Sequence, residues 1–378
     1  MKPVPAMTSG YGYGPKGLWE ILRNFDMLLF ALVLLVTLFG ILVIYGATWS
    51  VEGLSHYAWK QVVWTLVSLP VLLLLCLVDF RRFRQAAWPF YIVTLAALIL
   101  LMLVGSRIKG ARSWFSVGPI RIQPAEFAKL SVIMTLAHYL ALKERAMTHI
   151  RDLIVPTLIA AVPAFLILIQ PDLGTATLFF PMLLIMLYAG GTRRSLIVLL
   201  VLVAILAAFG TYPFLKPYQK ARIKVFLNPE HDQHWQGYNI KQAEIGLGSG
   251  GLLGKGWKQG TQARLRFLPE RHTDFIFSSL GEQFGFAGAL VLLGLYGSII
   301  LRSARPALLA NNTFGRLLVV GLLSCFCLHI LFNIGMTIRL MPVTGLPLPL
   351  FSYGGSFLLT NFMIFAMILN IDMRKYQF

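Results

Sequence analysis

Long apolar runs recur along the whole chain, with mostly short polar segments between them. A helix needs about 20 mostly apolar residues to cross the hydrocarbon core of a bilayer. Such runs lie near residues 26–48, 58–78, 86–104, 124–142, 153–169, 174–190, 195–215, 278–301, 317–337 and 353–371. The pattern predicts an all-α polytopic integral membrane protein with about ten transmembrane helices.

The charges of the short polar segments predict the orientation of these helices. Lys and Arg concentrate after the even-numbered runs, and loops rich in these residues face the cytoplasm. They are Arg81, Arg82, Arg84, Lys143, Arg145, Arg151, Arg193, Arg194, Arg302, Arg305, Arg316, Arg374 and Lys375. Both termini are therefore expected in the cytoplasm, residues 1–24 as a tail and residues 25–378 as a single membrane domain. The tail lacks the apolar core and cleavage site of a signal peptide, so the first helix should remain as an uncleaved anchor.

The same topology places three polar segments outside. They are residues 105–123, the junction at residues 170–175, and an extracytoplasmic loop of about 216–277 between the seventh and eighth helices. A loop of that length without structure of its own is usually functional or disordered. Residues 240–247 within it are equally compatible with a short interfacial helix and with plain loop.

Composition supports a membrane protein. It also shows an excess of positive charge that the predicted topology explains only in part. Of the 378 residues, 57% are hydrophobic and 13% charged, against roughly 25% charged in soluble domains. This excludes a soluble enzyme, a disordered chain and a disulfide-rich secreted domain. The formal net charge is +18, and about half of the Lys and Arg residues fall on the predicted outer side. The positive-inside rule accounts only for the other half.

Two ionisable residues fall at membrane depth at the start of the fourth apolar run. Such groups are costly there, and they are usually paired or functional. Glu126 and Lys129 are three residues apart, which puts both side chains on one face of a helix. They form either a self-satisfied ion pair that stabilises the helix or part of a site.

The segment before that run is basic, although it is predicted to lie outside. It carries Arg107, Lys109, Arg112 and Arg121 without an acid. Guanidinium groups bind phosphate oxygens in pairs, so this cluster suits an anionic lipid or a phosphate. Trp114 and Phe115 beside it are either interfacial anchors or a stacking surface for a sugar ring.

Two further acids lie next to predicted helix starts. Asp172 in IQPDLGT either caps the following helix or belongs to a site. Asp274 ends the run ERHTD at residues 270–274, immediately before an apolar helix. An Asp at the membrane surface, flanked by Arg271 and His272, can act as a general base toward a lipid-borne hydroxyl. The alternative is that Thr273 or Asp274 only caps the helix.

Other polar clusters carry weaker signals. His231, Asp232 and His234 lack a wider ligand set with zinc-like spacing, so no metal site is predicted there. The segment GLGSGGLLGKG departs from a phosphate-binding loop at Ser249 and Gly256, which argues against nucleotide binding. We expect no nucleic-acid partner. Near the C-terminus, MPVTGLPLPLFSYGG is predicted to be non-helical, which membrane depth tolerates only in buried or cavity-lining backbone.

Four segments together resemble the SEDS family of membrane glycosyltransferases, named for shape, elongation, division and sporulation. They are IRIQPAEFAK (120–129), IQPDLGT (169–175), FLPERHTDFIFSSLGEQFG (267–285) and LPLFSYGGS (348–356). The residues of the third segment and the short tails favour the RodA branch over the FtsW branch. The resemblance covers nearly the whole chain in the number and order of its helices and loops.

The resemblance implies a peptidoglycan glycosyltransferase that acts in elongation and rod-shape maintenance. Such enzymes polymerise lipid II, a disaccharide-pentapeptide on undecaprenyl pyrophosphate, at the outer face of the bacterial cytoplasmic (inner) membrane. The family's essential acid matches Asp274, which would be the general base of an inverting transfer. A class B penicillin-binding protein, the transpeptidase that cross-links the strands, is the implied protein partner. The alternatives are a lipid II flippase and a non-catalytic scaffold of the elongation machinery.

The resemblance also implies roles around the leaving group. Arg121 and Lys129 would neutralise charge on the pyrophosphate, and Glu126 would orient Lys129. Asp172 would be a polar wall of the same cavity or part of a site for a divalent cation, Mg or Mn. Two more residues, Arg271 and Trp114, complete the expected substrate-binding set, and no metal ligand is assigned.

Overall fold

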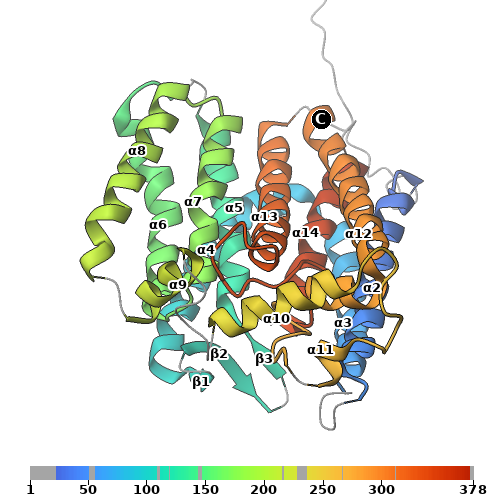
Figure 1. Ribbon diagram of the computed structural model, residues 1–378. Helices are drawn as coiled ribbons and strands as arrows, with labels where there is room; N and C mark the ends of the chain where they lie inside the picture. The colour runs from blue at the N-terminus through green and yellow to red at the C-terminus, as the bar shows by residue number, and fades with distance from the viewer. Residues whose placement is uncertain are drawn as a thin grey trace, which may run out of the picture.

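The structure is a computed structural model that describes residues 23–50, 56–108, 111–118, 120–143, 147–214, 217–227, 236–265, 267–310 and 312–374. Apolar helices stand side by side along most of this part of the chain (Figure 1). They are α2 (Met27–Thr48), α3 (His56–Leu77), α4 (Phe80–Val104), α5 (Pro124–Leu142), α6 (Ile154–Ile169), α7 (Leu173–Ala189), α8 (Arg194–Thr211), α12 (Ile276–Leu309), α13 (Thr313–Thr337) and α14 (Gly355–Met373).

Each predicted transmembrane run overlaps one of these helices. Among the described residues, nine helices are long and apolar enough to cross a membrane, with α6 extended by the preceding turn of 3-10 helix, and α7 is a shorter apolar helix. The two ends of the described chain lie at the same end of the bundle (Figure 1), which an even number of crossings requires. We call this the terminal end, and the opposite end the loop end.

Several of these helices begin at residues that can cap them. Asp26 accepts the N–H of Leu29 before α2, and Asp79 accepts the N–H of Arg81 before α4. Asn312 caps α13 in the same way. A side-chain oxygen at this position satisfies one of the free N–H groups of the first turn. These caps fix where the polar connections end and the apolar helices start.

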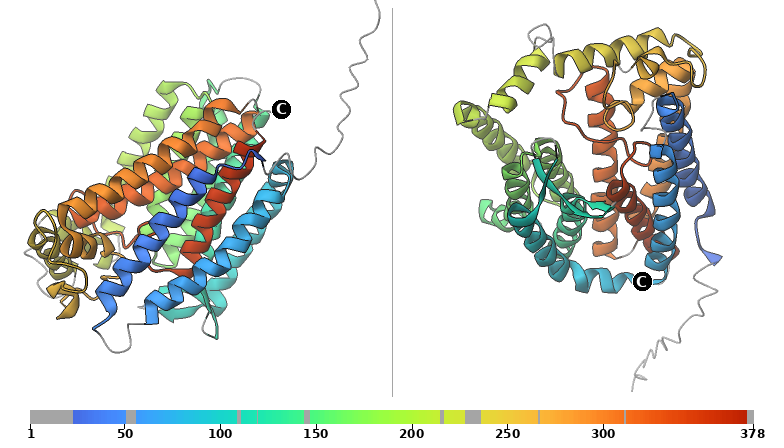
Figure 2. Two further views of the ribbon diagram at one scale, coloured as in Figure 1. Left: turned by 90° about the vertical axis from the view of Figure 1, so that its right-hand side faces the viewer. Right: turned by 90° about the horizontal axis from the view of Figure 1, so that it is seen from below.

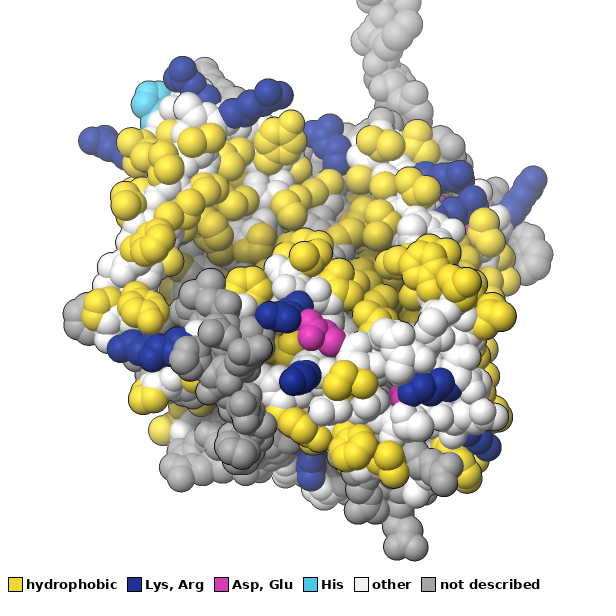
Figure 3. All heavy atoms as spheres, in the orientation of Figure 1, with side chains coloured by type: hydrophobic (Ala, Val, Ile, Leu, Met, Phe, Trp, Pro, Cys, Tyr) yellow, Lys and Arg dark blue, Asp and Glu magenta, His cyan; other side chains and the backbone are white. Residues whose placement is uncertain are grey.

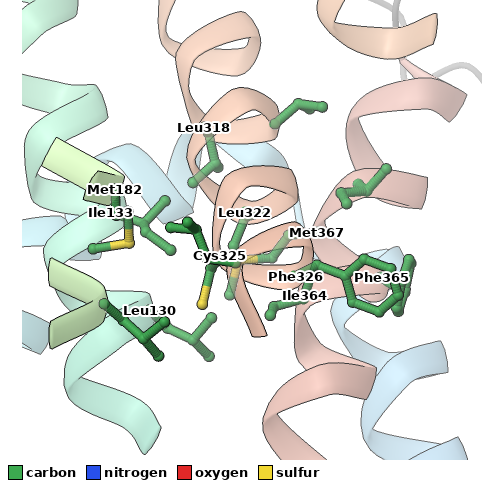
Figure 4. Close-up of a cluster of buried hydrophobic side chains, with 14 of the residues drawn as sticks. Leu130, Ile133, Met182, Leu318, Leu322, Cys325, Phe326, Ile364, Phe365 and Met367 are labelled. Atoms are coloured by element: carbon green, nitrogen blue, oxygen red, sulfur yellow. The ribbon is translucent and has the colours of Figure 1, made fainter. Parts of the chain in front are cut away.

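Helix α13 lies in the centre of the bundle and packs against α5, α7, α12 and α14. Figure 4 shows the apolar side chains that fill the space around it. They include Leu318, Leu322, Cys325 and Phe326 of α13, Leu130 and Ile133 of α5, Met182 of α7, and Ile364, Phe365 and Met367 of α14. Helix α8 contrasts with this core, because Leu196 is its only buried residue.

The outer surface has the pattern of a membrane protein. Apolar side chains cover the middle of the face shown in Figure 3, and Lys and Arg side chains lie above and below this band. Exposed apolar residues here are solvated by lipid rather than by water. The chain is therefore a multi-pass membrane protein.

The segment before α5 folds as a small antiparallel sheet, which the hydrophobic pattern did not predict. Strand β1 (Ser106–Ile108) pairs with β2 (Ala111–Val117), and β2 pairs with β3 (Ile120–Ile122). The sheet crosses the loop end of the bundle (Figure 2, right). The Ser113 hydroxyl donates to the carbonyl of Gln170, 3.2 Å away, and so ties the sheet to the end of α6.

The long polar segment between α8 and α12 also has structure of its own. It contains α9 (Pro217–Leu227), α10 (Gln236–Ser249) and α11 (Thr261–Arg264). Residues 240–247 lie within α10, so the helical alternative for them is confirmed. Helix α10 packs across α12 and α13 at the loop end (Figure 1). This segment therefore covers the end of the bundle at which α12 begins.

An ion pair joins the first and eighth spans at the terminal end. The Arg302 Nε of α12 lies 2.6 Å from Oδ2 of Asp26. Burial alone would raise the pKa of Asp26. The hydrogen bond and the charge of Arg302, together with backbone N–H groups of α2, outweigh burial, and the pKa of Asp26 lies below the usual 3.8. The pair links the chain before α2 to a helix far away in the sequence.

We expect this ion pair to stabilise the fold at neutral pH and to lose its effect in acid. Because the folded-state pKa of Asp26 lies below its unfolded-state value, the contribution is complete above pH 3.8 and disappears as the pH falls through the folded-state pKa. Thermal unfolding in detergent should show Asp26→Asn less stable than wild type at pH 7, with a smaller gap at about pH 3. A gap of the same size at both pH values would contradict this assignment.

Candidate active site

A buried ion pair lies where α5 begins at the loop end. The Lys129 ammonium is 3.0 Å from Oε1 and 2.9 Å from Oε2 of Glu126. Both side chains come from the first two turns of α5, and both residues are only 3% exposed. Ions taken out of water in this way need further polar partners to offset the lost hydration.

Two residues that the sequence analysis missed supply those partners. His329 Nε2 of α13 lies 2.7 Å from the Lys129 ammonium, so the imidazole accepts a hydrogen bond there in its neutral form. The Thr360 hydroxyl of α14 is 3.2 Å from Oε2 of Glu126, and the Phe357 ring lies 5.5 Å from the ammonium. We call Glu126, Lys129, His329 and Thr360 the buried polar cluster. The sequence indicated Glu126 and Lys129 by their spacing, whereas His329 was visible there only as an isolated His in an apolar run.

A narrow cavity opens beside the buried polar cluster. It has room for about one water molecule. All four residues of the cluster line it, together with Leu130, Cys325, Phe357, Asn361 and Ile364. The cavity thus brings the Lys129 cation and apolar side chains together in one small space.

Asp274 lies in the turn immediately before α12. Its backbone carbonyl accepts a hydrogen bond of 2.8 Å from the Asn333 side chain, which also donates to the carbonyl of Leu346 at 2.7 Å. Its half-buried carboxylate faces Gly345, where an added Cβ would lie 3.3 Å from Oδ2. Gly345 has φ +72°, a conformation that disfavours any side chain. The glycine therefore leaves space beside the carboxylate.

One face of α13 connects the two groups. His329, which contacts Lys129, and Asn333, which holds the turn of Asp274, are four residues apart. They are therefore neighbours on the helix surface, about 6 Å apart along its axis. The structure thus places the Asp274 turn and the buried cation one helical turn apart, although they come from distant parts of the sequence.

The segment between α13 and α14 is non-helical, as predicted, and it returns into the bundle. The Gln61 side chain of α3 donates to the carbonyl of Ser352 at 3.0 Å and accepts from the N–H of Gly354 at 3.3 Å. Leu348 and Phe351 of this segment are completely buried. Protein groups thus satisfy the irregular backbone, which is what membrane depth demands.

The same segment holds the turn of Asp274 in place. The Ser352 hydroxyl donates to the carbonyl of Thr273 at 2.6 Å, and the N–H of Tyr353 donates to the carbonyl of His272 at 2.9 Å. The His272 ring stacks on Tyr57 with centroids 4.4 Å apart. The turn is therefore fixed by α13, by the returning segment and by an aromatic contact with α3.

The basic segment before α5 reaches this region through Arg121. Arg121 is exposed on β3, and β3 packs against α14. Trp114 lies half-buried on β2, opposite Ser106 of β1. Lys109 and the side chains of Arg107 and Arg112 lie outside the described part of the chain.

Asp172 and Arg271 have structural contacts. Asp172 caps α7 by accepting the N–H of Thr175 at 3.0 Å and its hydroxyl at 2.9 Å, and it also accepts the Gln123 amide at 2.9 Å. Arg271 is 1% exposed, and its carbonyl accepts the Ser279 hydroxyl. A buried charge is costly unless it is paired and hydrogen-bonded. Substrate contacts of these two residues stay predictions.

The structure describes no obvious metal site. His231, Asp232 and His234 lie outside the described residues. Within the described ranges, no group of three or more His, Cys, Asp or Glu side chains is arranged to hold a metal ion.

Comparisons with known proteins identify the class of protein. The family model for FtsW, RodA and SpoVE, described as cell cycle protein, matches residues 26–377. The chain belongs to this family, and the resemblance carried by its four motifs is confirmed.

Individual relatives indicate which activity the chain has within this family. The chain is 37% identical to peptidoglycan glycosyltransferase MrdB of Escherichia coli strain K12, over 92% of this chain and 93% of that one. It is 32% identical to peptidoglycan glycosyltransferase RodA of Treponema pallidum, over 93% and 98%. One solved structure is described as structural coordination of polymerization and crosslinking by a peptidoglycan synthase complex. Its matching chain has a TM-score of 0.82 and 32% sequence identity, over 94% of this chain and 99% of that one. The protein is a membrane peptidoglycan glycosyltransferase of cell elongation.

Proposed function

We propose that this enzyme polymerises lipid II and that Asp274 is its general base. The observation that carries the proposal is the single face of α13 that holds both the Asp274 turn and Lys129. A base and a cation near one another suit a transfer in which an alcohol loses a proton while an anion leaves.

In the proposed step, the Asp274 carboxylate takes the proton of the GlcNAc 4-hydroxyl of the acceptor. The oxygen attacks the anomeric carbon of the donor MurNAc from the face opposite the leaving group. The bond from that carbon to the pyrophosphate oxygen breaks, with inversion, and undecaprenyl pyrophosphate departs. The fixed backbone of the Asp274 turn supports this role, because a base must be held in the attacking geometry.

Lys129 is proposed to stabilise the charge that develops on the pyrophosphate. Glu126 and His329 hold its ammonium in one position, so little reorganisation is needed as charge develops. Arg121 would contact the pyrophosphate from the exposed side. Trp114 and Arg271 are proposed as further substrate contacts, and Asp172 as a polar wall that also caps α7.

We propose that the loop end faces outward from a bacterial cytoplasmic membrane and that a class B penicillin-binding protein is the partner. The Lys and Arg residues after the even-numbered spans support this orientation. A partner that cross-links strands is supported by the solved relative, which belongs to a complex described as coordinating polymerization and crosslinking.

The test is glycan synthesis by the purified protein from lipid II in detergent, with and without the transpeptidase. We expect glycan polymers on gels and release of undecaprenyl pyrophosphate. Reconstituted vesicles that scramble lipid II, while no polymer forms under any condition, would contradict the proposal and favour a flippase. Neither polymer nor scrambling, despite an intact complex with the partner, would favour a scaffold.

A further inference from the structure

A second feature of the loop end involves residues 250–260, which we call the 250–260 loop. Helix α12 is broken at Gly285 (φ +62°, ψ −161°), so backbone groups on both sides lose their partners within the helix. The 250–260 loop replaces those partners. The bonds run from Lys255 N to Glu282 O at 2.9 Å, Gly256 N to Gln283 O at 3.1 Å, Phe286 N to Gly251 O at 2.9 Å and Ala287 N to Leu252 O at 3.0 Å.

The loop also reaches down the side of α2. The Trp49 indole, at the end of α2, donates to the carbonyl of Lys258 at 3.1 Å. The Trp257 indole donates to the carbonyl of Leu42 at 3.1 Å. Leu42 precedes Trp49 by seven residues, which is about 10 Å along a helix. The 250–260 loop therefore lies beside the last two turns of a membrane-spanning helix, at the depth of lipid headgroups and upper acyl chains.

The loop exposes apolar side chains at this depth. Leu252 is 74% exposed and Leu253 is 81% exposed, and Phe286 beside them on α12 is 57% exposed. Leucines with so much exposed surface are unfavourable in water but favourable in the upper acyl region of a bilayer. Trp49 and Trp257 are the residues typical of the boundary just above it.

A fixed cation lies at the same boundary. The Lys258 ammonium is 4.3 Å from the ring centroid of Trp257, 4.7 Å from that of Tyr45 and 5.4 Å from that of Trp49. Lys255, by contrast, forms an ion pair of 2.8 Å with Glu282. No described carboxylate lies within 4.0 Å of the Lys258 ammonium.

These observations describe a preformed site for a lipid anion. Three aromatic rings hold the Lys258 ammonium by cation–π contacts. These contacts use ring faces and not hydrogen-bond acceptors, so an anion can still accept hydrogen bonds from the ammonium. A phosphate at headgroup level is such an acceptor, and its acyl chains would cover Leu252 and Leu253. A zwitterionic lipid is a poorer occupant, because the ammonium of its own headgroup competes with Lys258.

We propose that the 250–260 loop and the end of α2 bind an anionic phospholipid of the adjacent leaflet, with its phosphate on Lys258. The site involves the side of the bundle formed by α2 and α12, whose helices lie next to each other in Figure 2 (left). It does not use the cavity of the buried polar cluster. Because the loop completes the backbone of α12, bound lipid would also hold the start of the helix that follows Asp274.

The test is native mass spectrometry of the full chain, with phosphatidylglycerol or phosphatidylcholine of the same acyl chains added to delipidated protein. Wild type should retain one phosphatidylglycerol more strongly than phosphatidylcholine. Lys258→Gln should weaken that binding by about fivefold, the effect expected of one basic residue at a membrane surface. The matched control is Lys241→Gln, which removes an exposed Lys from α10 in the same polar segment.

Leu252→Gln combined with Leu253→Gln tests the acyl contact separately and should weaken binding of both lipids. Equal retention of the two lipids by wild type would overturn the proposal, as would the same loss in Lys258→Gln and Lys241→Gln. A Lys258→Gln variant that binds lipid like wild type but loses a partner chain would assign the surface to protein instead. Because lipid retention is read without lipid II, the result is independent of the polymerisation assay.

Discussion

Replacement of Asp274 by Asn should abolish glycan polymerisation from lipid II while the protein remains folded. An amide of almost the same shape cannot take the proton of the acceptor hydroxyl, and loss of a positioned base typically costs about 10²- to 10⁴-fold in rate. The backbone bond from Asn333 and the glycine at 345 remain in the variant. The measurement is the initial rate of polymer formation by the purified protein, and thermal unfolding checks the fold.

Glu244→Gln is the matched control for this variant. Glu244 lies on α10 at the same end of the bundle, where it is 3.5 Å from Arg339 in a half-exposed ion pair. A pair of this kind contributes little to stability, and we expect the control to retain activity. Wild-type rates in Asp274→Asn would refute the general-base role. Equal losses in both variants would mean that negative charge at the loop end, rather than a base at Asp274, is required.

Replacement of Lys129 by Met should have the second largest effect, on activity and on stability together. Removing the cation leaves Glu126 buried without its ion-pair partner, which typically costs about 3–5 kcal/mol. Loss of a preorganised charge opposite a leaving group typically costs about 10²- to 10³-fold in rate. Unfolding in detergent and polymerisation rates measure the two effects separately.

The double variant Glu126→Gln with Lys129→Met separates the two effects. It removes both buried charges, so much of the lost stability should return, but the cation remains absent. We therefore expect a protein that is more stable than Lys129→Met and still inactive. Recovery of polymerisation together with stability would show that Lys129 acts only in folding and would remove it from the proposed site.

The individual motifs were visible in the sequence, but their partners were not. The spacing of Glu126 and Lys129 predicted one helix face, and both residues do lie together on α5. His329, Asn333 and Thr360 could not be found in this way, because each lies within an apolar run and no spacing links it to Glu126 or Lys129. Their contacts depend on how α13 and α14 pack, and the periodicity of a single helix carries no information about its neighbours.

Length and hydrophobicity determined the membrane class and the order of the helices, because crossing a bilayer imposes a minimum run of apolar residues on each span. They did not determine the sheet before α5, whose strands of three to seven residues are too short for a clear alternating pattern. Nor did they show that the 250–260 loop completes the broken α12, since hydrogen bonds between distant backbones leave no local pattern.

The +18 charge could be counted from the sequence alone, together with its predicted division between the two sides. Only the tertiary structure decided which of these charges are held in place. Lys129 is buried among three helices, Lys255 is paired with Glu282, and Lys258 is held by aromatic rings. The physical reason is that the strength of a charge depends on its burial and its neighbours, and packing brings those neighbours from distant segments.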